Sequence, residues 1–515
     1  LAHWSEANFE AMDSRNRSLH EKGFVTNSAR QDYRELSTLK YVDAGKEREM
    51  VVPKGDVLHQ FREDVQTGNL PAVSWLVPPE RFSDHPSNPW YGALYLSETL
   101  DILTQNPEVW RKTIFILCYD ENDGYFDHVP PFVPPRTDRT DTGAASAGID
   151  TSSEHVLEDP AKDPYDDGPG KAGRDGPIGL GFRVPMVVAS PWSRGGYVCS
   201  EVFDHTSVLR FLEEFASAKS GRAVRESNIS DWRRTICGDL SSVFRPFQST
   251  GPSLPRPLVR ETYLPEINQA QFRPVPSDFR SLPATEMASL AGKWPARQEP
   301  GVKPACALPY DLEVDGSLGA EGIFGISFSA GNERFGRRSV GAPFHVYSPA
   351  PVRRAGQGGE PREPGRTWSY AVAAGGRVEG KWRVEDFESG TYHLRVHGPN
   401  GFYREFRGTS GNGNVAVRMR TGATREPSCE IELKKIDGGP ITVVVEDAAY
   451  GAAPRRVPLG AGAVSLVLPI GLSASSGWYD LRMSIEGHAD YITRYAGRIE
   501  TGAESTSDPQ MGSAS

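Results

Sequence analysis

The sequence of 515 residues lacks the features that mark several classes of protein. No apolar run is long enough to cross a bilayer, so no transmembrane segment is predicted. The net charge of −10 argues against a protein that binds nucleic acid by neutralising phosphates, and against a broadly basic membrane-docking surface. The five cysteines are scattered and show neither CxxC nor zinc-ribbon spacing. What remains is the composition of an ordinary globular protein, long enough for two to four domains.

The most informative stretch begins with an apolar, β-branched run at residues 113–119, which predicts a strand buried on both faces. Asp120 and Glu121 follow directly, and the residues 122–124 predict a turn. Ligands of open α/β sheets bind beyond the carboxyl ends of strands. Where a strand gives way to a turn, two adjacent carboxylates can converge on one cation, and hard oxygen ligands suit a divalent metal. The alternative is a polar junction with two solvated acids.

A second loop is expected at the same edge of the sheet. Residues 71–77 predict a strand, and residues 90–105 predict an amphipathic helix that leads into the central strand. Strand, helix and strand form a right-handed unit by default, which makes the two strands parallel. His85 then follows the first strand and Asp120 follows its neighbour, so both loops would open on one edge.

The other segments of the first half of the chain predict a mixture of helices, loops and one further strand. Residues 1–66 are polar, with helical patches such as 57–67, and residues 135–180 indicate a long surface insertion poor in aromatic residues. Residues 184–189 predict a third strand. Asp204 is a plausible N-cap for a helix over 208–215, and His205 beside it favours a structural hydrogen bond over a role in a pocket.

Short alternating runs separated by glycine-rich turns follow residue 310, which is the pattern of β-sandwich modules. An internal repeat supports two tandem modules. Gly-Thr-Tyr-His-Leu-Arg at 390–395 recurs as Gly-Trp-Tyr-Asp-Leu-Arg at 477–482, a spacing of 477 − 390 = 87 residues. Downstream, Phe-x3-Phe-x-Gly at 402–408 matches Tyr-x3-Tyr-x-Gly at 491–497.

Three motifs together resemble the bacterial phosphoesterase family that includes phosphocholine-preferring phospholipase C, non-haemolytic and haemolytic, and related acid phosphatases. They are Ser-Asp-His-Pro at 83–86, Asp-Glu-Asn-Asp-Gly-Tyr-Phe-Asp-His-Val at 120–129, and the stretch from Arg183 to Gly196 with Asp204 to Glu213. The resemblance implies an α/β fold with a partial, alkaline-phosphatase-like parallel-sheet catalytic domain, followed by two small all-β sandwich domains. We expect half of the catalytic domain at 1–245, a Pro-rich connector at 246–309, β modules at 310–409 and 410–505, and a tail at 506–515.

The resemblance implies a secreted or periplasmic phospholipase C that meets phospholipid at a membrane surface. Metal-assisted hydrolysis of phosphatidylcholine, or of sphingomyelin, would yield diacylglycerol or ceramide and phosphocholine. Asp120 and Glu121 are the expected ligands of a divalent metal ion of unassigned identity. His85 is expected to contact the phosphoryl oxygens or to protonate the leaving alkoxide. His128 either lines the pocket or pins its loop with Asp127.

Two further motifs of the family are not found in residues 1–66: an upstream Glu-Asn-Arg-Ser-Phe-Asp-His-type ligand motif and a hydroxyl nucleophile. The chain also begins at Leu1 without an initiator methionine, so we expect the natural protein to carry a preceding segment. Two other functions stay open at this stage. One is an acid-phosphatase-like phosphomonoesterase, and the other is a non-catalytic protein that binds lipid or another surface through its β modules.

Overall fold

The computed structural model describes most of the chain. The described residues are 36–53, 58–78, 82, 89–122, 130–139, 141–156, 175–247, 259–275, 277, 279–290, 301–353, 362–412, 415–422 and 426–511. The chain divides into two compact units, the first containing residues 1–115, 189–194 and 247–291, and the second containing the rest. Among the described helices, none has the length and apolar character needed to cross a membrane.

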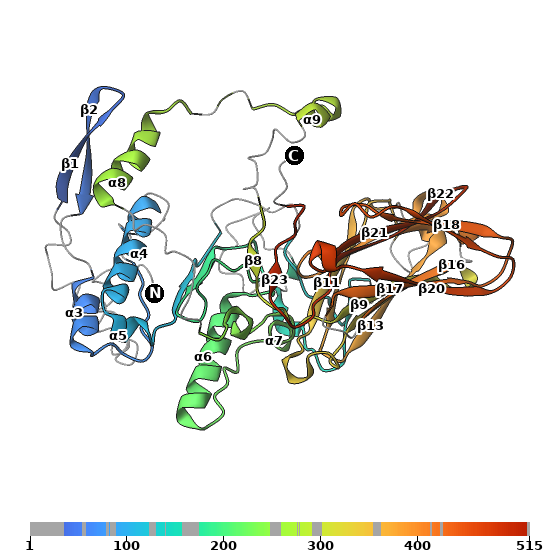
Figure 1. Ribbon diagram of the computed structural model, residues 1–515, viewed down its shortest axis with the longest axis horizontal. Helices are drawn as coiled ribbons and strands as arrows, with labels where there is room; N and C mark the ends of the chain where they lie inside the picture. The colour runs from blue at the N-terminus through green and yellow to red at the C-terminus, as the bar shows by residue number, and fades with distance from the viewer. Residues whose placement is uncertain are drawn as a thin grey trace. The chain divides into compact units, whose positions relative to one another are not determined.

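The first unit contains a β-hairpin that sequence analysis missed. Strands β1 (Leu36–Asp43) and β2 (Lys46–Pro53) are antiparallel and joined by Ala44 and Gly45. Both turn residues have positive φ, 48° and 80°, as a two-residue hairpin turn requires. Helix α8 (Arg260–Asn268) lies beside the hairpin, and the Tyr41 hydroxyl donates to the Asn268 side chain at 2.6 Å (Figure 1). The predicted helical patches therefore describe only part of residues 1–66.

Three helices form the core of the first unit. They are α3 (His59–Thr67), α4 (Pro89–Thr104) and the short α5 (Pro107–Trp110), so the helices predicted over 57–67 and 90–105 are confirmed. Their buried apolar residues include Phe61, Val65, Leu94, Ile102 and Leu103. The strand predicted over 71–77 is wrong, because these residues form no strand and the Trp75 side chain is 65% exposed. The connector region contributes α8 and a further helix, α9 (Ala284–Leu290).

The strands predicted on either side of the insertion do form, in shorter versions, but the prediction that the first is buried on both faces is wrong, because all four residues of β3 are only partly buried. Strand β3 (Phe115–Cys118) pairs with β7 (Met186–Ala189), and within the described residues these two make up the whole sheet. The insertion between them is more structured than predicted. Residues 141–156 include β4 (Gly143–Ala145), which pairs in parallel with a strand of the C-terminal region, and Ile149 is buried. The surface-insertion prediction is therefore wrong for residues 141–156.

Two helices follow β7 in the second unit. Helix α6 (His205–Ser220) begins at its N-cap Asp204, which confirms both the predicted helix and its cap. Helix α7 (Asp231–Ile236) buries Trp232 completely, in a small cluster with Ile149 and Ile236. Two very short strands, β5 (His155–Val156) and β6 (Gly176–Pro177), pair near the start of this region.

The C-terminal region is a set of β-sheets around one large apolar core. Its nine-stranded sheet has the order β19-β18-β21-β22-β15-β14-β11-β12-β4, and two three-stranded sheets have the orders β13-β10-β9 and β16-β17-β20. Each alternating run predicted as a strand, at residues 323–328, 370–373, 392–396, 415–419, 431–433, 441–445 and 464–468, lies in a strand, except that Ala373 follows the end of its strand. The bounds are β9 (Leu312–Leu318), β10 (Ile323–Ala330), β11 (Ala342–Ser348), β12 (Arg366–Val372), β13 (Arg377–Arg383), β14 (Thr391–His397), β15 (Tyr403–Thr409), β16 (Val415–Thr421), β17 (Ser428–Lys435), β18 (Ile441–Asp447), β19 (Arg455–Leu459), β20 (Val464–Gly471), β21 (Trp478–Ile485) and β22 (His488–Arg498).

The internal repeat corresponds to two hairpins at the centre of the nine-stranded sheet. One hairpin is β14 with β15, the other is β21 with β22, and their second strands β15 and β22 pair with each other antiparallel. In each hairpin the repeated tyrosine packs against the repeated glycine. A Cβ atom at Gly408 would lie 2.5 Å from the Tyr392 hydroxyl, and one at Gly497 would lie 3.1 Å from the Tyr479 hydroxyl. The repeat thus preserves a close contact between tyrosine and glycine that a larger residue would crowd.

The ends of the β-rich region are joined by one small sheet. Strand β8 (Pro304–Ala305) pairs antiparallel with β23 (Ser505–Thr506). The predicted modules 310–409 and 410–505 share the nine-stranded sheet through the β15–β22 pair. The predicted domain boundaries remain predictions, but the two modules are continuous in structure.

Candidate functional site

The loop after β3 is held by hydrogen bonds on both sides of its acidic pair. The Tyr119 backbone N–H donates to the Pro185 carbonyl at 3.2 Å. The Asn122 side-chain amide donates to the Arg183 carbonyl at 2.8 Å. Asp120 and Glu121 lie between these two anchors, and both are exposed. The structure therefore fixes the backbone of the acidic pair against the segment that precedes β7, while its carboxylates face solvent.

His205 contacts the same loop from the start of α6. Its Nε2 atom lies 2.9 Å from the Tyr119 carbonyl oxygen. Because a carbonyl oxygen only accepts hydrogen bonds, Nε2 carries the proton in this contact. The structural hydrogen bond expected for His205 is present, and it holds the residue immediately before Asp120. The predicted structural role is confirmed, and it adjoins the acidic pair.

Asp204 fixes the start of α6. Its carboxylate accepts from the Thr206 backbone N–H at 2.9 Å and from the Thr206 hydroxyl at 2.6 Å. Its own N–H donates to the Ser207 hydroxyl at 3.1 Å, which completes a capping box. The Asp204 side chain is only 4% exposed. A buried carboxylate needs a cationic partner, and the second half of this network supplies one.

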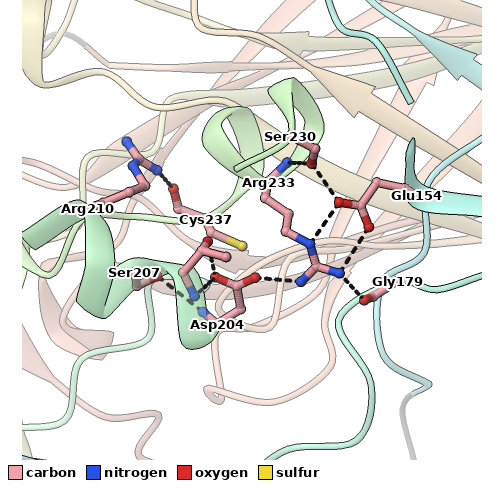
Figure 2. Close-up of polar contacts among 9 residues, drawn as sticks. Glu154, Gly179, Asp204, Ser207, Arg210, Ser230, Arg233 and Cys237 are labelled. Atoms are coloured by element: carbon pink, nitrogen blue, oxygen red, sulfur yellow. Dashed lines mark hydrogen bonds and ion pairs between the residues drawn. The ribbon is translucent and has the colours of Figure 1, made fainter. Parts of the chain in front are cut away.

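Arg233 of α7 bridges Asp204 and Glu154, as Figure 2 shows. Its Nη1 lies 2.6 Å from Asp204, and its Nε and Nη2 form a bidentate pair with Glu154 at 2.8 and 2.9 Å. The same guanidinium donates to the Gly179 carbonyl, and the Ser230 hydroxyl donates to Glu154. The cation thus joins the insertion, the start of α6 and α7 behind the candidate site.

Sequence reasoning missed Glu154 and Arg233. They are 79 residues apart, and Glu154 lies in the segment that was expected to be surface insertion. No local pattern marks either residue, since a single acid and a single arginine are ordinary on any surface. Only the folded chain shows that Glu154 is buried and that it pairs with the partly buried Arg233.

Cys118, at the end of β3, behaves as a structural residue. Burial first, and then the negative charges of Asp120 and Asp204, raise the pKa of its thiol. The thiol therefore stays protonated near neutral pH and donates to the Tyr119 carbonyl at 3.4 Å. Cys118 is only partly buried, and its protonated thiol argues against a nucleophile. The raised pKa also shows that the Asp120 and Asp204 carboxylates both act on the end of β3.

The acidic pair fits a hard divalent cation in the type of its ligands but supplies only two of them. Carboxylate oxygens are the ligands that Mg²⁺ and Ca²⁺ prefer. Within the described residues, no group of three or more His, Cys, Asp and Glu side chains is close enough to hold a metal ion. His85 and His128, together with Asp127, lie outside the described residues. The assignments of Asp120, Glu121, His85 and His128 therefore stay predictions.

Comparisons with known proteins point to one family. Residues 10–217 match the model of the Phosphoesterase family, and residues 304–409 match that of the bacterial phospholipase C C-terminal domain. The chain is 35% identical over 472 residues to non-hemolytic phospholipase C of Pseudomonas aeruginosa, covering 88% of this chain and 60% of that protein. It is 35% identical over 476 residues to non-hemolytic phospholipase C of Burkholderia pseudomallei, covering 89% of this chain and 60% of the relative.

A further relative matches a shorter stretch of the chain. Phospholipase C A of Mycobacterium tuberculosis is 42% identical over 204 residues, which cover 39% of this chain and 35% of that protein. The chain spans about three fifths of the length of the Pseudomonas and Burkholderia relatives. The expected resemblance is confirmed: the chain carries a region of the phosphoesterase family followed by a bacterial phospholipase C C-terminal domain.

Proposed function

We propose that the protein is a phospholipase C that hydrolyses phosphatidylcholine, or sphingomyelin, to phosphocholine and diacylglycerol or ceramide. Water is consumed, the bond between phosphorus and the lipid oxygen breaks, and the lipid leaves as an alcohol. The observation that supports this best is the joint match of a phosphoesterase region and a phospholipase C C-terminal domain on one chain. A phosphomonoesterase would need only the first region, so the second favours the lipase.

The proposed site lies at the end of β3, in an alkaline-phosphatase-like sheet to which β3 and β7 would belong. Asp120 and Glu121 would hold a divalent metal ion, which would neutralise charge on the non-bridging phosphate oxygens. His85 and His128 complete the proposal as groups that contact the phosphoryl oxygens or protonate the leaving alkoxide. These two roles are the ones that the resemblance to the family implies.

In this proposal, other residues of the site hold the backbone of the acidic pair in place. The hydrogen bond of His205 to Tyr119 and that of Asn122 to Arg183 fix the backbone on both sides of the acidic pair. Arg233 pairs with Asp204 (Figure 2), the N-cap residue of α6 that directly precedes His205. A ligand pair that is already fixed loses less conformational entropy when it binds a cation. We further propose a secreted or periplasmic location, where such an enzyme meets phospholipid surfaces.

The test compares two chromogenic substrates, p-nitrophenyl-phosphocholine as the diester and p-nitrophenyl phosphate as the monoester. We expect the full-length natural protein to hydrolyse the diester faster, to lose that activity with a chelator, and to regain it with a divalent metal. Faster hydrolysis of the monoester would replace the proposal with a phosphatase. Hydrolysis of neither substrate, together with binding to phosphatidylcholine vesicles, would support a surface-binding protein instead.

A further inference from the structure

Two of the five cysteines lie next to each other on paired backbone segments. Val198 and Ala305 form a parallel β-bridge. The Val198 N–H donates to the Pro304 carbonyl at 2.9 Å, and the Cys306 N–H donates to the Val198 carbonyl at 2.9 Å. Cys199 and Cys306 each follow a bridge partner by one residue, so they are in register and on the same face. Neighbouring strands lie about 4.8 Å apart, within the Cα separation of roughly 4.4–6.8 Å that a disulfide needs.

The surroundings of the two sulfur atoms differ. The Cys306 sulfur lies 3.5 Å from Nη1 of Arg245, whose guanidinium stacks 3.6 Å from the Tyr197 ring centroid. The Cys199 sulfur lies 3.3 Å from the Ser242 hydroxyl. Cys306 is 2% exposed, whereas Cys199 is partly exposed. The pair is thus open to solvent on the Cys199 side and carries a cation on the Cys306 side.

The electrostatics favour a reactive pair. The hydrogen bond with Cys199 is the largest effect on the Cys306 thiol, and with the positive charge of Arg245 it outweighs burial and lowers the pKa to about 7. The same hydrogen bond, together with burial, raises the pKa of the Cys199 thiol. One sulfur therefore carries thiolate character near neutral pH while the other keeps its proton. Thiol–disulfide exchange starts from such a thiolate.

We propose that Cys199 and Cys306 form a disulfide bond when the protein meets an oxidising environment. With glutathione disulfide as the oxidant, a thiolate of the pair attacks one glutathione sulfur and releases the first glutathione. The second cysteine gives up its proton, attacks the mixed disulfide and releases the second glutathione. Two protein thiols are oxidised to one disulfide, and one glutathione disulfide is reduced to two glutathione molecules.

The bond would link two segments that are distant in sequence, one at Cys199 and one at Cys306. A third segment, near the end of the chain, is already paired with the segment that contains Cys306. The segment before β9 pairs with Val198 on one side, and through β8 it pairs with β23 near the end of the chain on the other side. The Ser507 N–H donates to the Lys303 carbonyl at 2.8 Å and extends this contact. A disulfide at Cys306 would anchor the middle segment to the phosphoesterase region by a covalent link. This inference does not depend on the proposed catalytic activity.

The test is thiol mapping of the 515-residue protein. The native protein, and a sample refolded from urea, are equilibrated with oxidised and reduced glutathione and then denatured and alkylated without reduction. We expect three alkylated cysteines, Cys118, Cys237 and Cys429, and one linked peptide pair containing Cys199 and Cys306. Reduction before alkylation should give five modified cysteines. Five modified cysteines in both oxidised samples, or a different linked pair, would overturn the proposal.

Single variants make the mapping specific. Cys199→Ser and Cys306→Ser should each give four alkylated cysteines and no linked pair. The matched control is Cys429→Ala, in β17, which should keep the linked pair and give two alkylated cysteines. The closed loop spans 306 − 199 = 107 residues, so oxidation should raise the melting temperature of the wild type, by roughly 5 °C. An equal rise in Cys306→Ser would contradict a stabilising Cys199–Cys306 bond.

Discussion

At the scale of single residues, buried charges decide how the candidate site is held. Asp204 and Glu154 are 4% and 5% exposed at their side chains, and one guanidinium serves both. The loss of hydration of a buried ion pair cancels much of the free energy that its attraction contributes. The network as a whole is therefore weak evidence that it stabilises the protein. Removing one member is a different matter, because the remaining charges stay buried without a counterion.

Replacing Arg233 by Met should therefore destabilise the protein by about 3–5 kcal/mol, since it leaves two buried carboxylates unpaired. Urea unfolding followed by tryptophan fluorescence measures the change. The control is Arg383→Met, whose partner Glu385 is 72% exposed at its side chain, and which should have little effect. Equal stability of the two variants would show that the Arg233 network is solvated in solution.

A buried histidine should make stability depend on pH. His345 of β11 is 9% exposed and accepts a hydrogen bond at Nε2 from the Val133 N–H at 3.1 Å. Burial lowers the pKa of His345 to about 4, below the value of about 6.5 in an unfolded chain. The unfolded state binds more protons between these values, so stability is lost as pH falls from about 6.5 to about 4.

The His345→Gln variant should lose that dependence. The difference in unfolding free energy between wild type and variant should change by about 3 kcal/mol between pH 7.5 and pH 4, in the direction that favours the variant in acid. Urea unfolding at several pH values measures this difference. Groups that titrate in both proteins contribute equally to the two free energies, so their contributions cancel in the difference. Parallel pH profiles for the two proteins would show that His345 titrates normally.

At the scale of elements, strands marked by a local pattern could be predicted from the sequence. Features that depend on pairing between distant segments could not. Alternating runs after residue 310 were predicted as strands, and all of them form, because period-2 burial is visible in any short window. The run at 71–77 has strand-like residues but gains no partner strand, and Trp75 stays exposed. The pairing of β4 with β12 joins Ala144 to Tyr370, a contact that no local pattern encodes.

The candidate site shows the same difference between local features, which the sequence predicts, and long-range contacts, which it does not. The end of β3 and the Asp204 cap were predictable because each depends on neighbours in sequence. A structural hydrogen bond was expected for His205, but its partner Tyr119 lies 86 residues away and no local pattern identifies it. Glu154 and Arg233 were not, because their burial depends on how the insertion folds against α7.

The repeated hairpins predict that the two β modules unfold together. Phe406 of β15 is 2% exposed, and its ring centroid lies 5.6 Å from that of Phe324 and 6.1 Å from that of Tyr495, one from each module. Phe406→Ala should cost about 3–5 kcal/mol through the cavity it leaves. Hydrogen exchange should then speed up in β10 and β14 and, to a similar degree, in β21 and β22. Faster exchange confined to residues 310–409 would instead show two independent modules.

At the scale of the whole molecule, the chain combines a phosphoesterase region with a β-rich region built around one core. The loop between the paired strands β3 and β7 extends into that region, since β4 forms the edge of its nine-stranded sheet. The same insertion supplies Glu154 to the network behind the candidate site. The β-rich region is thus continuous with the elements that hold the site, in keeping with a structural role.

The proposed function requires that the acidic pair after β3 holds a metal ion needed for hydrolysis of a choline phosphodiester. The most direct measurement is the release of phosphocholine from phosphatidylcholine vesicles by wild type and by Asp120→Asn, with bound metal measured in both. The control is Asp138→Asn, an exposed acid paired with Arg136. We expect that only Asp120→Asn loses both metal and activity. Full metal content and full activity in Asp120→Asn would contradict it.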